Sequence, residues 1–94
     1  DLRWDSFYFR GPDGHHNLKA QNLVVFCQIA QGIDEWTWMF HLHRGDYSRW
    51  FRYAIKDEYL AKETERVERR SDLSPWQTRQ SIQELVNARY TLPE

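Results

Sequence analysis

The sequence predicts an all-α domain: a compact bundle of four or five short helices, preceded by an extended aromatic segment. Apolar residues recur over most of the chain at the three- and four-residue spacing of an amphipathic helix. Residues typical of helix starts and stops separate these stretches. The length of 94 residues suits a single domain, and the 40% hydrophobic and 16% aromatic content is enough for a packed core.

Residues 1–16 are expected to form an extended arm and a turn. Ser6–Arg10 carries bulky side chains and can run as a short extended segment. Because a lone strand cannot satisfy its own backbone, this segment has to pair elsewhere or pack as coil. Gly11–Gly14 reads Gly-Pro-Asp-Gly, a strong turn signal. Helices are expected over residues 17–90.

The first two helices are delimited by polar caps and a glycine. Asn17 can cap a helix over Leu18–Gln31, which Gly32 would end. The second half of this helix is apolar nearly all round, as in a helix buried at the centre of a domain. Asp34 is expected to cap a second helix over Glu35–Arg44. The predicted inward face of the second helix is Trp36, Met39, Phe40 and His43.

The central stretch combines a helix stop with a helix start. Gly45 suits the left-handed position that ends a helix, and Asp46 suits the N-cap of the next helix. The apolar residues that follow fall on one face: Tyr47, Trp50, Phe51, Ala54 and Ile55. Arg49, Arg52 and Lys56 fall at steps of three and four on another side, so we expect them to form one cationic row.

Two further helices complete the predicted bundle. Asp57 can cap a helix over about residues 58–70, which has a thin apolar stripe and should be mostly exposed. Ser74, Pro75 and Gln77 form a complete start signal with a capping box. The last helix is expected to run to about Tyr90. Its predicted buried residues are Ile82, Leu85 and Val86, with Trp76 as a further candidate.

Composition and charge exclude several classes of protein. The net charge of −1 gives no general drive toward nucleic acid or a membrane surface. No apolar run is long enough to span a bilayer. Cys27 is the only cysteine, which excludes an intrachain disulfide and a cysteine metal cluster and fits a reducing compartment. We therefore expect a cytoplasmic protein, and the absent initiator Met indicates a fragment of a longer chain.

No residue pattern of a catalytic or metal site is found. Cys27 lies in the most apolar stretch, where a thiolate is disfavoured. His41 and His43 are two residues apart on a helix and do not face the same way, unlike the four-apart pair of a helical zinc site. The serines and carboxylates that could act fall at helix caps and first turns. We expect no catalytic residue, metal or cofactor in this chain.

The candidate site is a cationic surface that combines Arg44, at the end of the second predicted helix, with Arg49, Arg52 and Lys56 of the central helix, with Tyr53 among them. The usual state of such residues is a solvated face. The alternative is an anion or acidic-partner site, because Arg presents a planar fork of donors that suits carboxylate and phosphate. Nucleic acid is the less favoured ligand, since the chain is slightly acidic overall and no known module signature is present.

Six segments distributed over most of the chain carry a family resemblance: Phe7–Pro12, Asn17–Leu23, Arg44–Arg52, Ile55–Asp57, Leu73–Pro75 and Arg89–Thr91. In these segments the chain resembles a helical domain that follows the phosphatase core in some bacterial haloacid-dehalogenase-superfamily hydrolases. The resemblance implies an accessory helical unit. The Asp-x-Asp nucleophile motif, the Lys and the Mg²⁺-binding acidic pair of these phosphatases are not in the chain. No catalytic role therefore transfers to any residue here, and any Mg²⁺ would belong to the parent protein.

These observations favour a non-catalytic accessory or protein-interaction domain of a larger, phosphatase-related protein. Such a domain would pack on the phosphatase core, shape substrate access or mediate assembly with another protein or a second copy. The alternative is a binding module for a phosphate-bearing ligand or nucleic acid through the cationic helix face.

Overall fold

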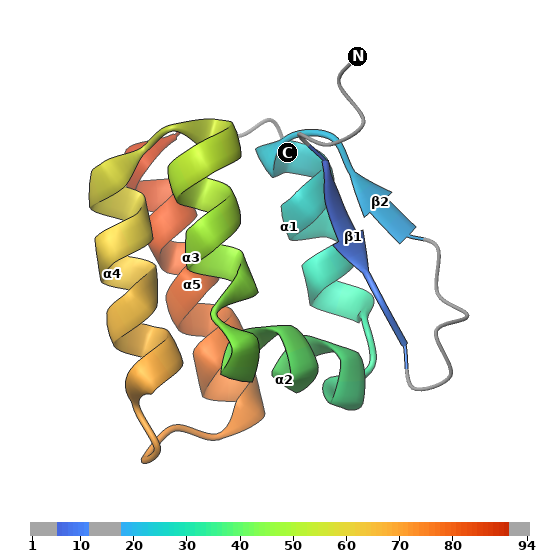
Figure 1. Ribbon diagram of the computed structural model, residues 1–94. Helices are drawn as coiled ribbons and strands as arrows, with labels where there is room; N and C mark the ends of the chain where they lie inside the picture. Colours follow the sequence, from blue (N-terminus) through green and yellow to red (C-terminus); the bar gives the residue numbers. More distant parts are fainter. Residues whose placement is uncertain (1–5, 12–17, 91–94) are drawn as a thin grey trace.

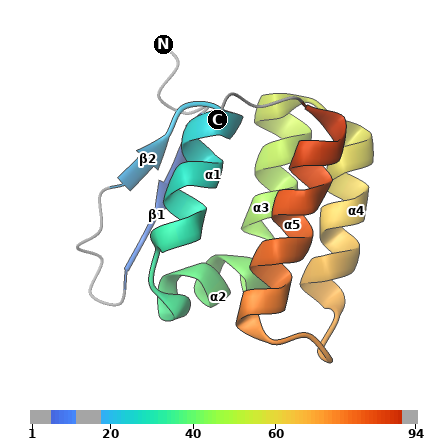
Figure 2. The same cartoon turned by 180° about the vertical axis from the view of Figure 1, so that it is seen from behind.

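A computed structural model describes residues 6–11 and 18–90 of the chain. Its helices and strands are β1 (Phe7–Phe9), β2 (Leu18–Ala20), α1 (Leu23–Gly32), α2 (Glu35–Arg44), α3 (Asp46–Trp50), the π-helical segment η2 (Phe51–Ile55), α4 (Glu58–Arg69) and α5 (Pro75–Arg89). The helices α3, α4 and α5 lie side by side as one group (Figure 1). Helix α1 and the two strands form the other side, and α2 crosses between the two groups (Figure 2). The all-α prediction with an extended aromatic segment is confirmed.

The extended segment pairs with a strand that the sequence analysis had assigned to a helix. β1 runs antiparallel to β2, with Phe7 opposite Ala20 and Phe9 opposite Leu18. Helix α1 therefore begins later than predicted, at Leu23, because its preceding residues satisfy their backbone groups in the sheet. The helix cap is Asn22, whose side chain accepts a hydrogen bond from the backbone N–H of Val25 at 2.9 Å. The predicted cap Asn17 and most of the predicted turn lie outside the described residues.

The core is dominated by aromatic rings from several elements. Phe7 and Phe9 of β1 both point inward, and Tyr8 between them is 38% exposed. Their rings contact Phe26 of α1 and Tyr47 of α3. Such edge-to-face and offset contacts join the strand, α1 and α3 into one hydrophobic cluster.

The inward face of α2 differs from the prediction. The buried residues are Thr37, Trp38, His41 and Leu42, whereas Trp36 is 48% exposed. Trp38 is fully buried: its indole Nε1 donates to Thr78 Oγ1 at 2.9 Å, and its backbone C=O accepts from the Tyr47 hydroxyl at 2.9 Å. These two buried polar partners orient α2, because an indole N–H without an acceptor would be costly in a core.

The junction of α2 and α3 follows the prediction at one residue and departs from it at the next. Gly45 has φ 72° and ends α2 in the left-handed conformation, as predicted. Asp46 does not cap α3; it is the first helical residue, and its carboxylate turns back toward α2. Beyond Trp50 the helix widens into η2 and ends at Lys56, which has φ 66°. The predicted apolar face holds for Tyr47, Trp50 and Phe51, which are buried, whereas Ala54 and Ile55 are half-buried.

The remaining helix starts are as predicted. The Asp57 side chain accepts from the Leu60 N–H at 3.0 Å, and Ser74 and Gln77 form a reciprocal capping box. In α5, Ile82 and Val86 are buried and Leu85 is half-buried. Trp76, the further candidate for burial in α5, is 59% exposed. Among the described residues, no helix has both the length and the apolar character needed to cross a membrane.

Candidate functional site

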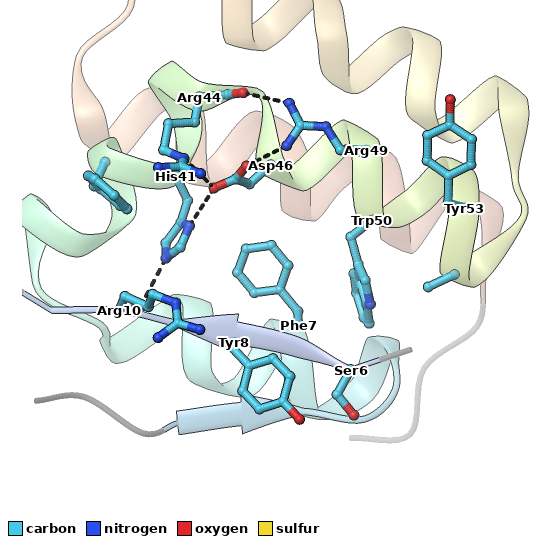
Figure 3. Close-up of a pocket in the computed structure, with 12 residues that line it drawn as sticks. Ser6, Phe7, Tyr8, Arg10, His41, Arg44, Asp46, Arg49, Trp50 and Tyr53 are labelled. Carbon is cyan, nitrogen blue, oxygen red and sulfur yellow. Dashed lines mark hydrogen bonds and ion pairs between the residues drawn. The ribbon is translucent and has the colours of Figure 1, made fainter. Parts of the chain in front are cut away.

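A groove with a volume of about 430 Å³ lies between β1 and the junction of α2 and α3 (Figure 3). Phe7 and Trp50, which are both buried, form its apolar base. The more exposed residues that line it are Tyr8, Arg10, Phe40, Arg44, Arg49 and Tyr53. An apolar base with a few polar groups around it, in a hollow of this size, is typical of a binding site.

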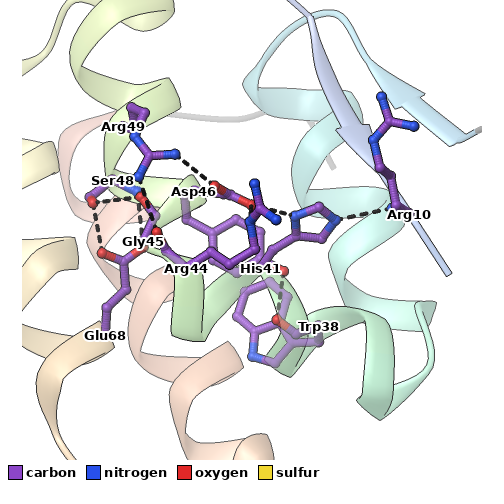
Figure 4. Close-up of polar contacts among 10 residues, drawn as sticks. Arg10, Trp38, His41, Arg44, Gly45, Asp46, Ser48, Arg49 and Glu68 are labelled. Carbon is purple, nitrogen blue, oxygen red and sulfur yellow. Dashed lines mark hydrogen bonds and ion pairs between the residues drawn. The ribbon is translucent and has the colours of Figure 1, made fainter. Parts of the chain in front are cut away.

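Asp46 is the centre of the polar contacts beside the groove (Figure 4). Its carboxylate contacts His41 Nδ1 at 2.8 Å, Arg44 Nε at 3.2 Å and Arg49 Nη1 at 2.8 Å. Arg49 Nη2 also donates to the backbone C=O of Arg44 at 3.1 Å. One carboxylate that is 15% exposed thus holds two arginines whose side chains are 61% and 59% exposed.

His41 is held from both sides. Its Nε2 accepts a hydrogen bond from the backbone N–H of Arg10 at 3.0 Å, so the proton of the neutral ring is on Nδ1 and is donated to Asp46. Burial lowers the pKa of His41, outweighing the opposite effect of Asp46. The ring is therefore neutral at pH 7 and links the end of β1 to the α2–α3 junction. With both nitrogens engaged, His41 cannot act as a base toward a ligand.

The candidate nucleophiles are also engaged. The Ser48 hydroxyl donates to Glu68 Oε1 at 2.6 Å, and the Ser48 backbone N–H donates to Oε2 at 3.1 Å. Burial raises the pKa of Glu68, and the two hydrogen bonds from Ser48 partly offset this effect. Burial also raises the pKa of Cys27 to about 11. The Ser48–Glu68 pair joins α3 to α4, and Cys27 packs in the core.

The structure divides the predicted cationic row. Arg44, Arg49 and Tyr53 line the groove. Arg52 instead turns to α4, where its Nε contacts Glu58 at 3.0 Å and its Nη1 contacts Glu65 at 2.9 Å.

These ion pairs raise the pKa of Arg52 and neutralise its charge locally. A second hollow of about 340 Å³ is bordered by Arg44, Arg49, Arg52 and Tyr53. Its lining also includes Glu65 and Glu68. Lys56, at the end of η2, lines neither hollow.

Trp36 and Phe40 were not among the predicted site residues, whereas Arg44 was predicted. Trp36, Phe40 and Arg44 stack along α2, and we call them the aromatic ladder. The rings of Trp36 and Phe40 are 5.1 Å apart with planes at 10°, and Arg44 Cζ lies 5.1 Å from the centre of the Phe40 ring. Trp36 and Phe40 had been predicted to face the core. The four-residue spacing of two aromatic residues and an arginine was the available signal, because such residues are neighbours on a helix surface.

Within the described ranges, no group of three or more His, Cys, Asp or Glu side chains is placed to hold a metal ion. Comparisons of the chain with protein-family models, curated proteins and solved structures found no match.

Proposed function

We propose that this chain is a non-catalytic accessory domain that binds a protein surface through the aromatic ladder and the adjoining groove. The observation that carries the proposal is the clustering of exposed Trp, Tyr and Arg side chains beside a hollow with an apolar base. These three residue types are enriched among the residues that dominate binding energy at protein interfaces.

The state of the reactive side chains supports a non-catalytic role. His41 has both ring nitrogens bonded, and Ser48 is held by Glu68. Cys27 is buried and has a raised pKa, so its thiolate is disfavoured. Glu68, the carboxylate that accepts the Ser48 hydroxyl, also accepts the Ser48 backbone N–H, so this pair joins the buried Ser48 of α3 to α4.

We further propose that the parent protein is a cytoplasmic hydrolase related to the haloacid-dehalogenase phosphatases. The resemblance of the six segments supports this assignment, and the buried lone cysteine fits a reducing compartment. In this proposal the parent core supplies the catalytic residues and binds Mg²⁺. The present domain packs on that core or on a partner protein.

The test is to express the longer protein that contains this chain and to divide it into the 94-residue domain and the remainder. Binding of the two parts in trans would be measured by isothermal titration calorimetry. Trp36→Ala combined with Arg44→Gln is expected to weaken binding by about tenfold or more. Trp76→Ala combined with Arg66→Gln, which changes exposed side chains elsewhere, is the matched control and should have little effect.

Two results would overturn the proposal. One is equal weakening by the ladder variant and the control, which would place the contact elsewhere. The other is measurable hydrolysis of para-nitrophenyl phosphate with Mg²⁺ by the 94-residue chain alone.

A further inference from the structure

We infer that the aromatic ladder and the groove together bind an acidic protein segment. In this arrangement carboxylates of the segment meet Arg10, Arg44 and Arg49, and a large apolar side chain lies over the base of the groove. The inference rests on the proposed function and specifies the chemistry of the partner.

The ladder and the groove are continuous. Phe40 and Arg44 belong to the ladder and also line the groove. From Trp36 to Arg44 the helix rises by about 12 Å, and the groove extends this surface across to β1 (Figure 3). A surface of this length suits a stretch of several residues from a protein better than a small molecule, which would fill the groove and leave Trp36 exposed.

The charges around the groove favour an anionic partner. Three arginines, Arg10, Arg44 and Arg49, line the groove together with a single carboxylate, that of Asp46. The neighbouring His41 is neutral. The guanidinium of Arg10 makes no hydrogen bond or ion pair with the described ranges of the chain.

Arg44 and Arg49 also retain donors, because each guanidinium carries five N–H groups and only a minority contact Asp46 or the Arg44 carbonyl. The unused N–H groups can bind carboxylates in the paired geometry that Arg favours.

The aromatic residues require more from the partner than charge. Tyr53 is 69% exposed and Tyr8 is 38% exposed on the rim of the groove, and the base is formed by Phe7 and Trp50. A partner that carried only acidic groups would leave Tyr8, Tyr53 and Trp36 exposed to water. An apolar side chain between carboxylates would cover them and gain the free energy of burying apolar surface.

Nucleic acid fits this surface less well. Binding along a phosphate backbone needs a succession of unpaired cations. Arg52 is engaged by Glu58 and Glu65, and Lys56 lies off the groove. The chain as a whole has a net charge of −1. Among the described residues that line the groove, three arginines accompany one carboxylate, which matches a short acidic segment.

The experiment is a selection from a phage-displayed library of random twelve-residue peptides on the immobilised 94-residue chain. The expected result is enrichment of peptides that combine Asp or Glu with Trp, Phe or Leu. Binding of an enriched synthetic peptide should fall by about tenfold or more with Arg10→Gln and with Trp36→Ala. The controls Arg66→Gln and Trp76→Ala should bind as the wild type does. Circular dichroism would show that all four variants are folded.

The other outcomes count against the inference in distinguishable ways. Enrichment of basic or uncharged peptides whose binding is still lost with Trp36→Ala would overturn the acidic partner and leave the proposed interaction surface intact. No enrichment, or loss of binding only with the control variants, would overturn the inference. Salt-sensitive binding of a twenty-nucleotide oligothymidine, abolished by Arg10→Gln, would assign the groove to nucleic acid instead.

Discussion

Two aspartates at helix starts have opposite surroundings. Asp57 is 5% exposed and its two carboxylate oxygens accept from the Leu60 N–H, the Arg89 guanidinium and the Tyr90 hydroxyl. Asp46 is 15% exposed and makes no cap hydrogen bond. Its oxygens contact His41 and two largely exposed arginines.

The difference shows how one residue type serves stability at one junction and positioning at another. At Asp57 the partners come from the start of α4 and the end of α5, and they leave the carboxylate side chain 5% exposed. At Asp46 the carboxylate orients arginines that still present donors to solvent. Mutations around Asp57 should therefore affect mainly the stability of the fold, and mutations around Asp46 mainly binding.

The largest effect is expected from Asp57→Ala. The change removes a helix cap and leaves Arg89 and the Tyr90 hydroxyl without their acceptor, so unfolding should become easier by about 3 kcal/mol. Asp46→Asn keeps an acceptor for His41 and should cost only about 1 kcal/mol. Urea denaturation followed by tryptophan fluorescence measures both. Equal losses at the two positions would show that Asp46 also serves mainly to stabilise the fold.

The arginine partners provide a second comparison. Arg89 binds Asp57 through two nitrogens and lies 4.9 Å from the centre of the Tyr59 ring. Arg89→Gln should cost about 1–2 kcal/mol because it leaves a buried carboxylate without its cation. Arg49→Gln should cost less than about 0.5 kcal/mol, as is usual for an exposed ion pair. A larger loss for Arg49→Gln than for Arg89→Gln, in the same urea experiment, would reverse the assignment of the two clusters.

Two tyrosines sharpen the comparison further. The Tyr90 hydroxyl donates to Asp57 at 2.7 Å, and Tyr90→Phe should cost about 1 kcal/mol. Tyr53 is 69% exposed on the groove, and Tyr53→Phe should leave stability within about 0.5 kcal/mol of wild type. Thermal unfolding followed by circular dichroism compares the two. An equal decrease for both would mean that the Tyr53 hydroxyl has a structural partner.

The smallest effect is expected in the pH dependence of the free energy of unfolding. The lowered pKa of His41 means that the unfolded chain binds a proton more readily than the fold does. The contribution of neutral His41 is complete above its ordinary pKa of 6.5 and is lost as pH falls from 6.5 toward the lowered value.

For Asp57 burial opposes ionisation, but the Leu60 N–H, Tyr90 and Arg89 outweigh it and lower the pKa below 3.8. The stability that Asp57 provides is lost only as pH falls below 3.8. As pH falls, the stability provided by His41 beside Asp46 should therefore begin to be lost at a higher pH than the stability provided by Asp57.

The measurement is the free energy of unfolding of wild type and His41→Gln from pH 7 to pH 4. Subtracting the two series removes the contribution of Glu68, whose raised pKa acts with the opposite sign above 4.5. The advantage of wild type should shrink as pH falls below 6.5. A constant difference would show that His41 does not titrate differently in the fold.

The features that were predicted correctly depend on short-range interactions. Asp34, Asp57 and Ser74 each accept a backbone N–H three residues later, and Gly45 adopts the left-handed conformation that ends a helix. These interactions are completed within a few residues of the chain, so the local sequence is enough to predict them.

The features that were missed depend on distant partners. The strand Leu18–Ala20 is stabilised by pairing with Phe7–Phe9, which no pattern inside Leu18–Ala20 indicates. Helix α2 carries a tryptophan on each of two faces, Trp36 on one and Trp38 on the other. The face with Trp38 is the buried one, and there the Trp38 indole donates a hydrogen bond to Thr78 of α5.

The candidate site was predicted only in part for the same reason. Arg44, Arg49 and Tyr53 line the groove from the consecutive elements α2, α3 and η2, but Tyr8 lies in β1 and Arg10 directly after β1, far away in sequence. Arg52 leaves the expected row to pair with Glu58 and Glu65 of α4, and the helix changes to π-helical hydrogen bonding after Trp50. No residue preference in Phe51–Ile55 signals that change.

Two of the polar links between distant parts of the chain span almost equal lengths of sequence. The Arg10 N–H reaches His41 across 31 residues, and Arg89 reaches Asp57 across 32 residues. Because the entropy lost on closing a loop depends mainly on its length, both closures carry nearly the same entropic penalty. We therefore expect the order in which these two contacts form during folding to follow the apolar surface buried with each contact, not the number of residues between the partners.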